Sequence, residues 1–550
     1  MRDGTYELSV EGGKPIAEDR LNPRPGRADG RAGGCSSSRA RRHTSRARPT
    51  EMSVEPGTVR GARVDVEGVS VPLDHYIDGR RVASDDQFEV RSPIDWENWK
   101  LADVAAGGKT VVDVAVSAAR RAFPQWAALG PQGRHEVLTR LADAIDAAVP
   151  DLAKVETVDN GSLYEAMSLR VLPRAANNIR FFADFARDRL NDPARTLPGG
   201  ERNRVRYDPA GVTAVSTPWN APFMLATWRV GPALAAGNTV VLKPPEWAPL
   251  TCSLLGDLAD QAGLPPGVLN IVHGTGATAG APLTGHPNVD RVAFTGSPAT
   301  ARTVYADAAA HLTPVSFELG GKSPFIVFED ADLDAAAATA AYQYDNSGQV
   351  CLAGTRLLVQ RSILDEFERR FQANVNKIKV GDPRDADTTY GPLIHPVALE
   401  RVTGYVERAI DAGARLVFGG EPLGGLYYPP TLFVDVPSEA EILHREVFGP
   451  VLTLQAFDDE AEAIELANGT DYGLAATIYT GSDARAERVS AAVAAGTVWV
   501  NCFYVRDLET PFGGARDSGI GREGGRHSFD FYCDVKTVVE RTSLFNSSAE

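Results

Sequence analysis

The sequence predicts an α/β fold in which a doubly wound parallel sheet is followed by a second set of strands and helices. From about Val71 onward, short β-rich runs alternate with amphipathic helical stretches, which is the pattern of a parallel-sheet protein. No internal repeat is evident. The chain has 550 residues, of which 43 % are hydrophobic, and this is enough for about two to four domains with full-sized cores.

The clearest alternation of strands and helices runs from Gly211 to Gly321. β-Branched and apolar residues make up the strand runs, and the helical run FMLATWRVGPALAAG ends at Gly237, a typical helix-terminating residue. The predicted elements are strand 212–217, helix 223–237, strand 239–244, helix 246–262, strands 268–274 and 291–297, helix 299–310 and strand 315–319. This order favours a doubly wound nucleotide-binding sheet.

A second α/β set follows the nucleotide-binding pattern. It begins with the run FIVFED, includes the helical run SILDEFERRFQANVNKIKV, and ends with a strand near 535–540. We expect two domains built from these sets, a small β arm and an N-terminal extension. The predicted boundaries are 1–60 for the extension, 61–190 with 210–320 for the cofactor domain, 321–520 for the catalytic domain, and 191–209 with 530–550 for the arm and C-terminal strand.

The charge of the chain excludes several kinds of partner. Asp and Glu number 72 against 56 Lys and Arg, which gives a net charge of −16. Nucleic acids and anionic membrane surfaces require a basic face, so we expect neither as a partner. The uncharged run 209–228 contains Pro209, Gly211, Pro218 and Pro222, and such residues argue against a membrane span.

Cysteine and histidine patterns argue against disulfides and metal sites. The five cysteines, Cys35, Cys252, Cys351, Cys502 and Cys533, are sparse and odd in number, which fits a reducing compartment. We therefore expect the protein in the cytoplasm. The nine histidines form no HExxH motif and no CxxC pair is present, so we expect no metal site.

The segment 21–50 is rich in Arg, Gly, Ser and Pro and almost free of apolar residues. Such a composition cannot bury enough surface to offset the entropy of ordering, so we expect a disordered extension. Acidic residues before it argue against a transit peptide, and Arg41-Arg42 precedes no apolar run. Met52 is the expected start of the functional chain.

Two glycine-rich runs resemble phosphate-binding loops but have the wrong spacing. Residues 274–280 read GxGxxxG, one residue longer than the dinucleotide fingerprint. GGKS at 320–323 would need a glycine at position 316, which is Ser316. Neither run predicts an NTPase.

The run DNSGQVCLAGTR places Cys351 among polar residues and next to Gly348. A lone cysteine is most often a small core residue, but Asn346, Ser347 and Gln349 are too polar for a core strand. A cysteine on such a loop, between a helix and a strand, is open to substrate and is expected to keep its thiolate, the nucleophilic form.

Together with six other runs, this segment resembles the aldehyde dehydrogenase superfamily over roughly residues 76–539. The runs that carry the resemblance are NSGQVCLAGTR (346–356), FELGGKSP (317–324), TPWNAPF (217–223), LKPPEWAPL (242–250), FTGSP (294–298), EVFGPVL (446–452) and PFGGARDSGIGREGG (511–525). The resemblance implies a Rossmann-type cofactor domain, an α/β catalytic domain and an oligomerisation arm that forms a homodimer or homotetramer.

By this resemblance, Cys351 adds to the aldehyde as a thiolate, hydride leaves for the nicotinamide and a thioester remains. The amide of Asn220 and the backbone N–H of Cys351 resemble the pair that binds the oxyanion. Glu318 resembles the general base for hydrolysis, and burial at a strand end would raise its pKa towards neutrality. Relatives that transfer the acyl group to coenzyme A lack this glutamate, so hydrolysis to the free acid is favoured.

The resemblance also implies a cofactor site. Lys243 and Glu246 resemble the residues that bind the adenosine ribose, and a carboxylate there repels a 2′-phosphate, which favours NAD over NADP. The other residues that resemble cofactor contacts are Trp219, Gly276, Gly296, Ser297, Glu446 and Phe448.

The runs APFMLATW, KPPEWAP, VRDLETPFGG and SFDFYCDVK most resemble dehydrogenases of hydroxymuconic and carboxymethyl-hydroxymuconic semialdehydes. Because those substrates are anionic, Arg506 is a candidate for binding a carboxylate, with Arg170 and Arg174 as further candidates. Three alternatives stay open: a general or betaine-type aldehyde dehydrogenase, a coenzyme A-acylating semialdehyde dehydrogenase, and a non-catalytic relative.

Overall fold

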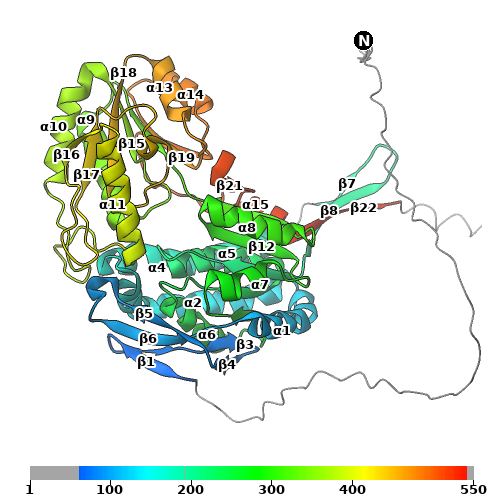
Figure 1. Ribbon diagram of the computed structural model, residues 1–550. Coiled ribbons are helices and arrows are strands. Elements are labelled where there is room, and N and C mark those ends of the chain that lie inside the picture. The colour runs from blue at the N-terminus through cyan, green and yellow to red at the C-terminus, as the bar shows by residue number, and fades with distance from the viewer. Residues whose placement is uncertain (1–60, 191–192, 542–550) are drawn as a thin grey trace, which may run out of the picture. The chain divides into compact units, whose positions relative to one another are not determined.

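A computed structural model of the protein describes residues 61–190 and 193–541. The predicted disordered extension, residues 1–60, lies outside the described residues, as do the last nine residues of the predicted C-terminal segment. The described chain contains two large sheets, each flanked by helices (Figure 1). The predicted α/β fold class is therefore confirmed.

The first sheet has eight strands in the order β21-β13-β12-β9-β10-β11-β3-β4. Strands β9 to β13 pair in parallel, whereas β3, β4 and β21 are antiparallel to their neighbours. The strand bounds are β3 (His75–Ile77), β4 (Arg80–Val82), β9 (Val212–Ser216), β10 (Thr239–Lys243), β11 (Leu269–Ile271), β12 (Arg291–Gly296), β13 (Val315–Leu319) and β21 (Gly519–Ile520). The strands predicted between 212 and 319 are all present.

Helices cover both faces of this sheet because its parallel strands are apolar on both sides. Within β10, Val240 and Leu242 pack on one face and Val241 on the other. The helices on the first face are α2 (Gly130–Asn160), α4 (Leu172–Asp188), α5 (Pro222–Ala236) and α6 (Leu250–Gln261). Those on the second face are α1 (Lys109–Ala128), α7 (Ala281–Thr284) and α8 (Pro298–Ala309).

The second sheet has seven strands in the order β16-β17-β18-β15-β14-β19-β20, and only β16 is antiparallel to its neighbour. Its strands are β14 (Pro324–Val327), β15 (Arg356–Gln360), β16 (Arg415–Phe418), β17 (Thr431–Val434), β18 (Val451–Phe457), β19 (Ala475–Tyr479) and β20 (Thr497–Val500). The helices beside it are α9 (Leu333–Ala341), α10 (Leu364–Val375), α11 (Pro396–Asp411), α12 (Glu441–His444), α13 (Glu460–Asn468) and α14 (Asp483–Ala492).

Three antiparallel strands form a narrow arm that extends from the first sheet and its helices (Figure 1). They are β7 (Arg195–Thr196), β8 (Arg202–Pro209) and β22 (Cys533–Glu540), and β22 follows α15 (Gly525–Tyr532). Two hairpins, β1 (Arg63–Val66) with β2 (Val69–Pro72) and β5 (Gln87–Arg91) with β6 (Lys100–Ala105), complete the strands. The predicted domain boundaries stay a prediction, and β21 joins the first sheet although it falls within 321–520.

Helix α6 begins at Leu250, four residues later than the sequence predicts. Pro249 stands at its N-cap position, and the residue before a proline is disfavoured in helical conformation. Residues 244–249 therefore form a turn that carries Glu246 beyond the end of β10. Among the described residues, no helix combines the length and the apolar character needed to cross a bilayer.

Candidate active site

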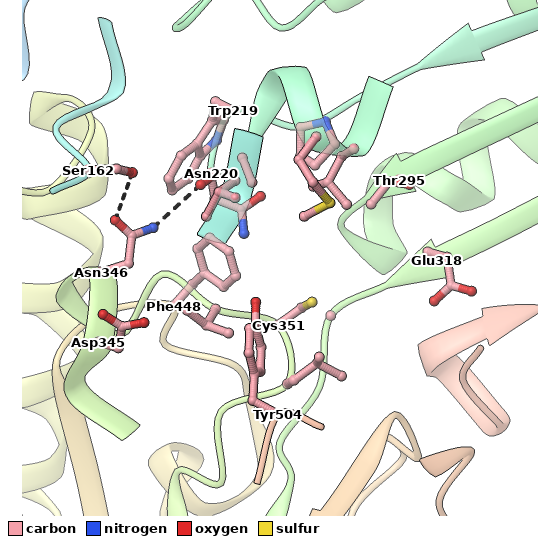
Figure 2. A pocket seen from close by; sticks show the side chains of 18 of the residues that line it. Ser162, Trp219, Asn220, Thr295, Glu318, Asp345, Asn346, Cys351, Phe448 and Tyr504 are labelled. Carbon is pink, nitrogen blue, oxygen red and sulfur yellow. Dashed lines mark hydrogen bonds between the residues drawn. The ribbon is translucent and has the colours of Figure 1, made fainter. Parts of the chain in front are cut away.

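A cavity of about 640 Å³ opens where β9, β12 and β13 end. Parallel strands bring their carboxyl ends to one edge of a sheet, which is where ligands bind in this class of fold. The cavity is lined by Asn220, Glu318 and Cys351, the three residues predicted to be catalytic. Figure 2 shows Asn220 and Glu318 on different sides of Cys351.

The loop before Cys351 has an unusual backbone. Asn346, Ser347 and Gly348 have φ angles of 52°, 58° and 67°, the left-handed region that favours glycine and tolerates asparagine. A Cβ at Gly348 would lie 2.1 Å from the carbonyl oxygen of Gly449. Glycine at 348 thus lets the cysteine loop lie against the 446–450 segment, and Cys351 is presented between a helical turn and β15, as predicted.

Hydrogen bonds tie Asn220 to the cysteine loop at two points. The Asn220 side-chain amide donates to the Gln349 carbonyl at 2.9 Å, and Asn346 Nδ2 donates to the Asn220 carbonyl at 3.4 Å. Ser162 Oγ in turn donates to Asn346 Oδ1 at 3.0 Å (Figure 2). One N–H of the Asn220 amide is used in this contact, and an amide group has two, so the second N–H is available to a ligand.

The structure corrects the expectation that Cys351 keeps its thiolate. Burial raises the pKa of the Cys351 thiol to about 12, and the carboxylates of Glu446 and Glu318 add to this effect, while Arg506 opposes it. A loop position alone does not lower the pKa of a thiol. At Cys351, desolvation and the negative charges of Glu446 and Glu318 favour the neutral form. These surroundings favour the protonated thiol, so formation of the thiolate requires a base.

Glu318, near the end of β13, has the properties of such a base. Burial raises its pKa to about 8, with Glu523 raising it further and the guanidinium groups of Arg229 and Arg506 opposing. The residue is 7 % exposed. The prediction that burial moves the pKa of this carboxyl towards neutrality is confirmed, and a carboxyl that titrates near neutral pH can accept and release a proton.

Five of the eight predicted cofactor residues line this cavity: Trp219, Gly296, Ser297, Glu446 and Phe448. The ring centroids of Trp219 and Phe448 are 5.3 Å apart with their planes nearly perpendicular. Glu446 accepts a hydrogen bond from the backbone N–H of Gly321 at 3.1 Å, and burial raises its pKa to about 7. Ser297 caps the N-terminus of α8 by accepting from the Thr300 N–H.

The other three, Lys243, Glu246 and Gly276, form a separate cluster beyond β10 and β11. Lys243 Nζ donates to Glu246 Oε2 at 2.8 Å. Burial disfavours the ionised form of Glu246, but Lys243 outweighs it and the Gly276 N–H also helps, so the pKa lies below its usual value. A charged carboxylate here suits hydroxyl donors and repels phosphate.

The two clusters together fit a dinucleotide. Carboxylates stand in both of them, Glu446 in one and Glu246 in the other, and each can accept hydrogen bonds from a ribose. One cluster contains Gly276, where no atom lies within 4 Å of a built Cβ, and the other contains Ser297, the N-cap residue of α8. Helix N-termini and bare glycine backbone are suited to a pyrophosphate.

The three candidate arginines also line the cavity, but their surroundings differ. Arg170 contacts Tyr342 and Asp345. Among the described residues, neither Arg174 nor Arg506 forms an ion pair. The Arg506 guanidinium lies 3.5 Å from the ring centroid of Phe512, and burial together with Arg174 lowers its pKa to about 10.

The sequence motifs do not point to several polar residues of the cavity, among them Tyr342, Asp345 and Tyr504. Asp345 lies in the same run as Cys351 and could have been considered with it. The sequence around the two tyrosines does not indicate a functional role, because aromatic residues near a helix end or before a loop usually contribute to packing. In the described part of the chain, no group of three or more His, Cys, Asp or Glu residues is arranged to hold a metal ion.

Comparison with known proteins agrees with this arrangement. Residues 81–538 match the sequence model of the Aldehyde dehydrogenase family. The chain belongs to this family.

Members of the aldehyde dehydrogenase family are oxidoreductases that act on aldehydes. The chain is 42 % identical over 481 residues to the 2-hydroxymuconic semialdehyde dehydrogenase of Pseudomonas sp. strain CF600, covering 85 % of this chain and 99 % of that protein. It is 42 % identical over 466 residues to the 5-carboxymethyl-2-hydroxymuconate semialdehyde dehydrogenase of Escherichia coli, covering 83 % and 98 %.

Among solved structures, the P. syringae indole-3-acetaldehyde dehydrogenase in complex with NAD+ has a TM-score of 0.84 at 38 % identity. That match covers 86 % of this chain and 98 % of the other. The aldehyde dehydrogenase fold predicted from the sequence is thereby confirmed.

The raised pKa of Cys351 predicts slow alkylation near neutral pH. The rate constant with iodoacetamide should rise about tenfold per pH unit from pH 7 to 10, because only the thiolate reacts. Glu446→Gln should speed the reaction at pH 9, since it removes a charge that raises the thiol pKa. Peptide mass spectrometry follows the label, with Cys351→Ser as the control for Cys502. A rate that levels off between pH 7 and 8 would contradict the account.

Proposed function

We propose that this protein oxidises a carboxylate-bearing aldehyde of the hydroxymuconic semialdehyde type to the carboxylic acid, with NAD+ as the acceptor and a thioester on Cys351 as the intermediate. The observation that carries the proposal is the shared cavity, in which Cys351, Asn220 and Glu318 lie with two arginines that form no ion pair among the described residues. The similarity to two semialdehyde dehydrogenases supports the substrate class.

The first step joins the sulfur of Cys351 to the aldehyde carbon. Because the resting thiol is protonated, its proton must leave as the bond forms, and Glu318 is the carboxylate in the cavity suited to take it. The carbonyl oxygen becomes an oxyanion, which the free N–H of the Asn220 amide and the backbone N–H of Cys351 would hold. Losing one such donor typically slows a reaction about 100- to 1,000-fold.

Bound NAD+ would accept the hydride that leaves the aldehyde carbon, and a thioester of Cys351 remains. Glu318 gives its first proton to solvent and then takes a proton from the water that attacks the thioester. The C–S bond breaks, Cys351 regains a proton, and the carboxylate product leaves. Per aldehyde the balance is one NAD+ and one water consumed, and one carboxylate, one NADH and two protons released.

The cofactor proposal rests on the two clusters around the carboxyl ends of the strands. Glu446, Phe448 and Trp219 would hold the nicotinamide end beside Cys351, and Glu246 with Lys243 the adenosine ribose. The negative charge of Glu246 disfavours a 2′-phosphate, which supports NAD over NADP.

The three alternative functions fit the cavity less well. A betaine-type substrate is cationic, and the arginines would repel it. Transfer to coenzyme A needs no base for water, whereas Glu318 lies in the cavity as a buried carboxyl with a pKa of about 8. A non-catalytic role would not require Cys351, Asn220 and Glu318 to line one cavity.

The arm supports the proposal that the enzyme is a homodimer or homotetramer. β22 is an edge strand of the three-stranded arm sheet, and its residues Val535 and Val539 are 50 % and 57 % exposed. Edge strands with exposed apolar residues are suited to pairing with another chain.

Hydrolysis of the thioester should depend on the ionisation of Glu318. The ionised carboxylate is the base, so the steady-state rate of NADH formation at saturating aldehyde should rise with pH and level off above about pH 8. Glu318→Gln should remove this dependence and lower the rate by about 100-fold or more. Glu329→Gln, at an exposed carboxylate, serves as the control. An unchanged profile in Glu318→Gln would refute the assignment of the base.

The two arginines should affect only aldehydes that carry a carboxylate. Arg506→Gln or Arg174→Gln should lower kcat/KM for 6-oxohexanoate by about 10- to 100-fold, because a charge-assisted hydrogen bond is lost. The same variants should change kcat/KM for hexanal, which lacks the carboxylate, by less than about threefold. NADH absorbance measures both, with the exposed Arg369→Gln as control. Equal losses for the two aldehydes would contradict an anionic substrate.

A further inference from the structure

Four arginines line the cavity, and two of them already have partners within the protein. Arg401 Nη2 donates to the Phe448 carbonyl at 3.4 Å, beside Glu446. Arg170 Nη1 donates to the Tyr342 hydroxyl at 2.7 Å, and Arg170 Nη2 lies 3.9 Å from Asp345 Oδ2. In contrast, Arg174 Nε has no hydrogen-bond partner among the described residues. The guanidinium group of Arg506 lies against an aromatic ring and forms no ion pair there.

Asp345 is the acidic residue that pairs with Arg170 and with neither Arg174 nor Arg506 among the described residues. Its side chain is three-quarters buried, and it lies on the segment that leads to Cys351, beside Asn346 (Figure 2). Burial raises the pKa of Asp345, whereas Arg170 and Tyr342 favour its ionised form. A carboxylate in a cavity that receives anions is unfavourable unless a cation compensates it, and Arg170 is that cation.

We propose that Asp345 is a specificity-determining residue that pairs with Arg170 and leaves Arg174 and Arg506, rather than all three candidate arginines, for the substrate carboxylate, so that the enzyme selects aldehydes with one carboxylate over aldehydes with two. This inference rests on the proposed function. The inference distinguishes the substrates for which the two relatives are named. 2-Hydroxymuconic semialdehyde has one carboxylate, and 5-carboxymethyl-2-hydroxymuconate semialdehyde has two.

The selection follows from the charges that each substrate meets. One carboxylate can bind between Arg174 and Arg506, whose mutual repulsion it relieves. A second carboxylate would have to approach the Arg170–Asp345 pair. There the second carboxylate would meet the guanidinium of Arg170, whose charge Asp345 already neutralises, and the carboxylate of Asp345, which would repel it. Repulsion between like charges is a common source of specificity.

The test compares kcat/KM for the two semialdehydes in the folded full-length enzyme with NAD+. In Asp345→Asn, Arg170 loses its carboxylate partner, so kcat/KM for the dicarboxylate should rise by roughly three- to tenfold relative to the monocarboxylate. An unchanged ratio, or an equal rise for both substrates, would overturn the proposal.

A double-mutant cycle separates the release of Arg170 from the simple loss of a negative charge. The gain produced by Asp345→Asn should vanish in the Arg170→Gln background, because no guanidinium remains to be released. A gain of the same size in that background would overturn the proposal. Should Asp345→Asn fail to fold, Tyr342→Phe removes the hydroxyl that holds Arg170 and should move the ratio in the same direction.

The result distinguishes this inference from the proposed function. A wild-type enzyme that prefers 6-oxohexanoate to hexanal but shows no response to Asp345→Asn would retain the proposed function and lose the specificity role. A wild-type enzyme without any preference for carboxylate-bearing aldehydes would refute the proposed function and the inference together.

Discussion

A buried ion pair between Arg229 and Glu523 joins the segments on which the candidate site depends. Both side chains are fully buried. Arg229 lies on α5, the helix that follows Asn220, and donates to Ser316 Oγ on β13, two residues before Glu318. Breaking a buried pair by removing one partner typically costs about 3–5 kcal/mol. The helix, the strand and the C-terminal segment are thus held in one arrangement.

The same interaction extends to the part of the cavity that Arg506 lines. The backbone of Glu523 pairs with that of Phe512 through two hydrogen bonds, and the Phe512 ring packs against Arg506. Desolvation then sets the charges inside, since it raises the pKa of Cys351 and Glu318 and lowers that of Arg506. In the cavity, desolvation therefore favours the protonated thiol of Cys351 and gives Glu318 a pKa near neutrality, so activation of the thiol requires a base, and Glu318 has the pKa of one.

The sequence predicts much of this because local patterns determine the strands and the motifs. Gly348 and its polar neighbours identify the loop of Cys351, and alternating strands and helices predict the sheet that carries Glu318. The pKa of Cys351 could not be predicted, because it depends on burial inside the assembled cavity and on Glu446, 95 positions away in the chain. The pairing of Asp345 with Arg170 also joins segments that are distant in the chain. No local sequence pattern could therefore show which arginines of the cavity lack an acidic partner.

The central claim is that the acyl group passes through Cys351, and the most direct test is to trap it. The wild-type enzyme is mixed with NAD+ and 6-oxohexanoate, quenched in acid within milliseconds, before the thioester is hydrolysed, and digested for peptide mass spectrometry. The account predicts an acyl group on the peptide that contains Cys351, in an amount that matches the NADH formed in the first turnover. NADH formation with unmodified Cys351, or with the acyl group on Cys502 instead, would contradict it.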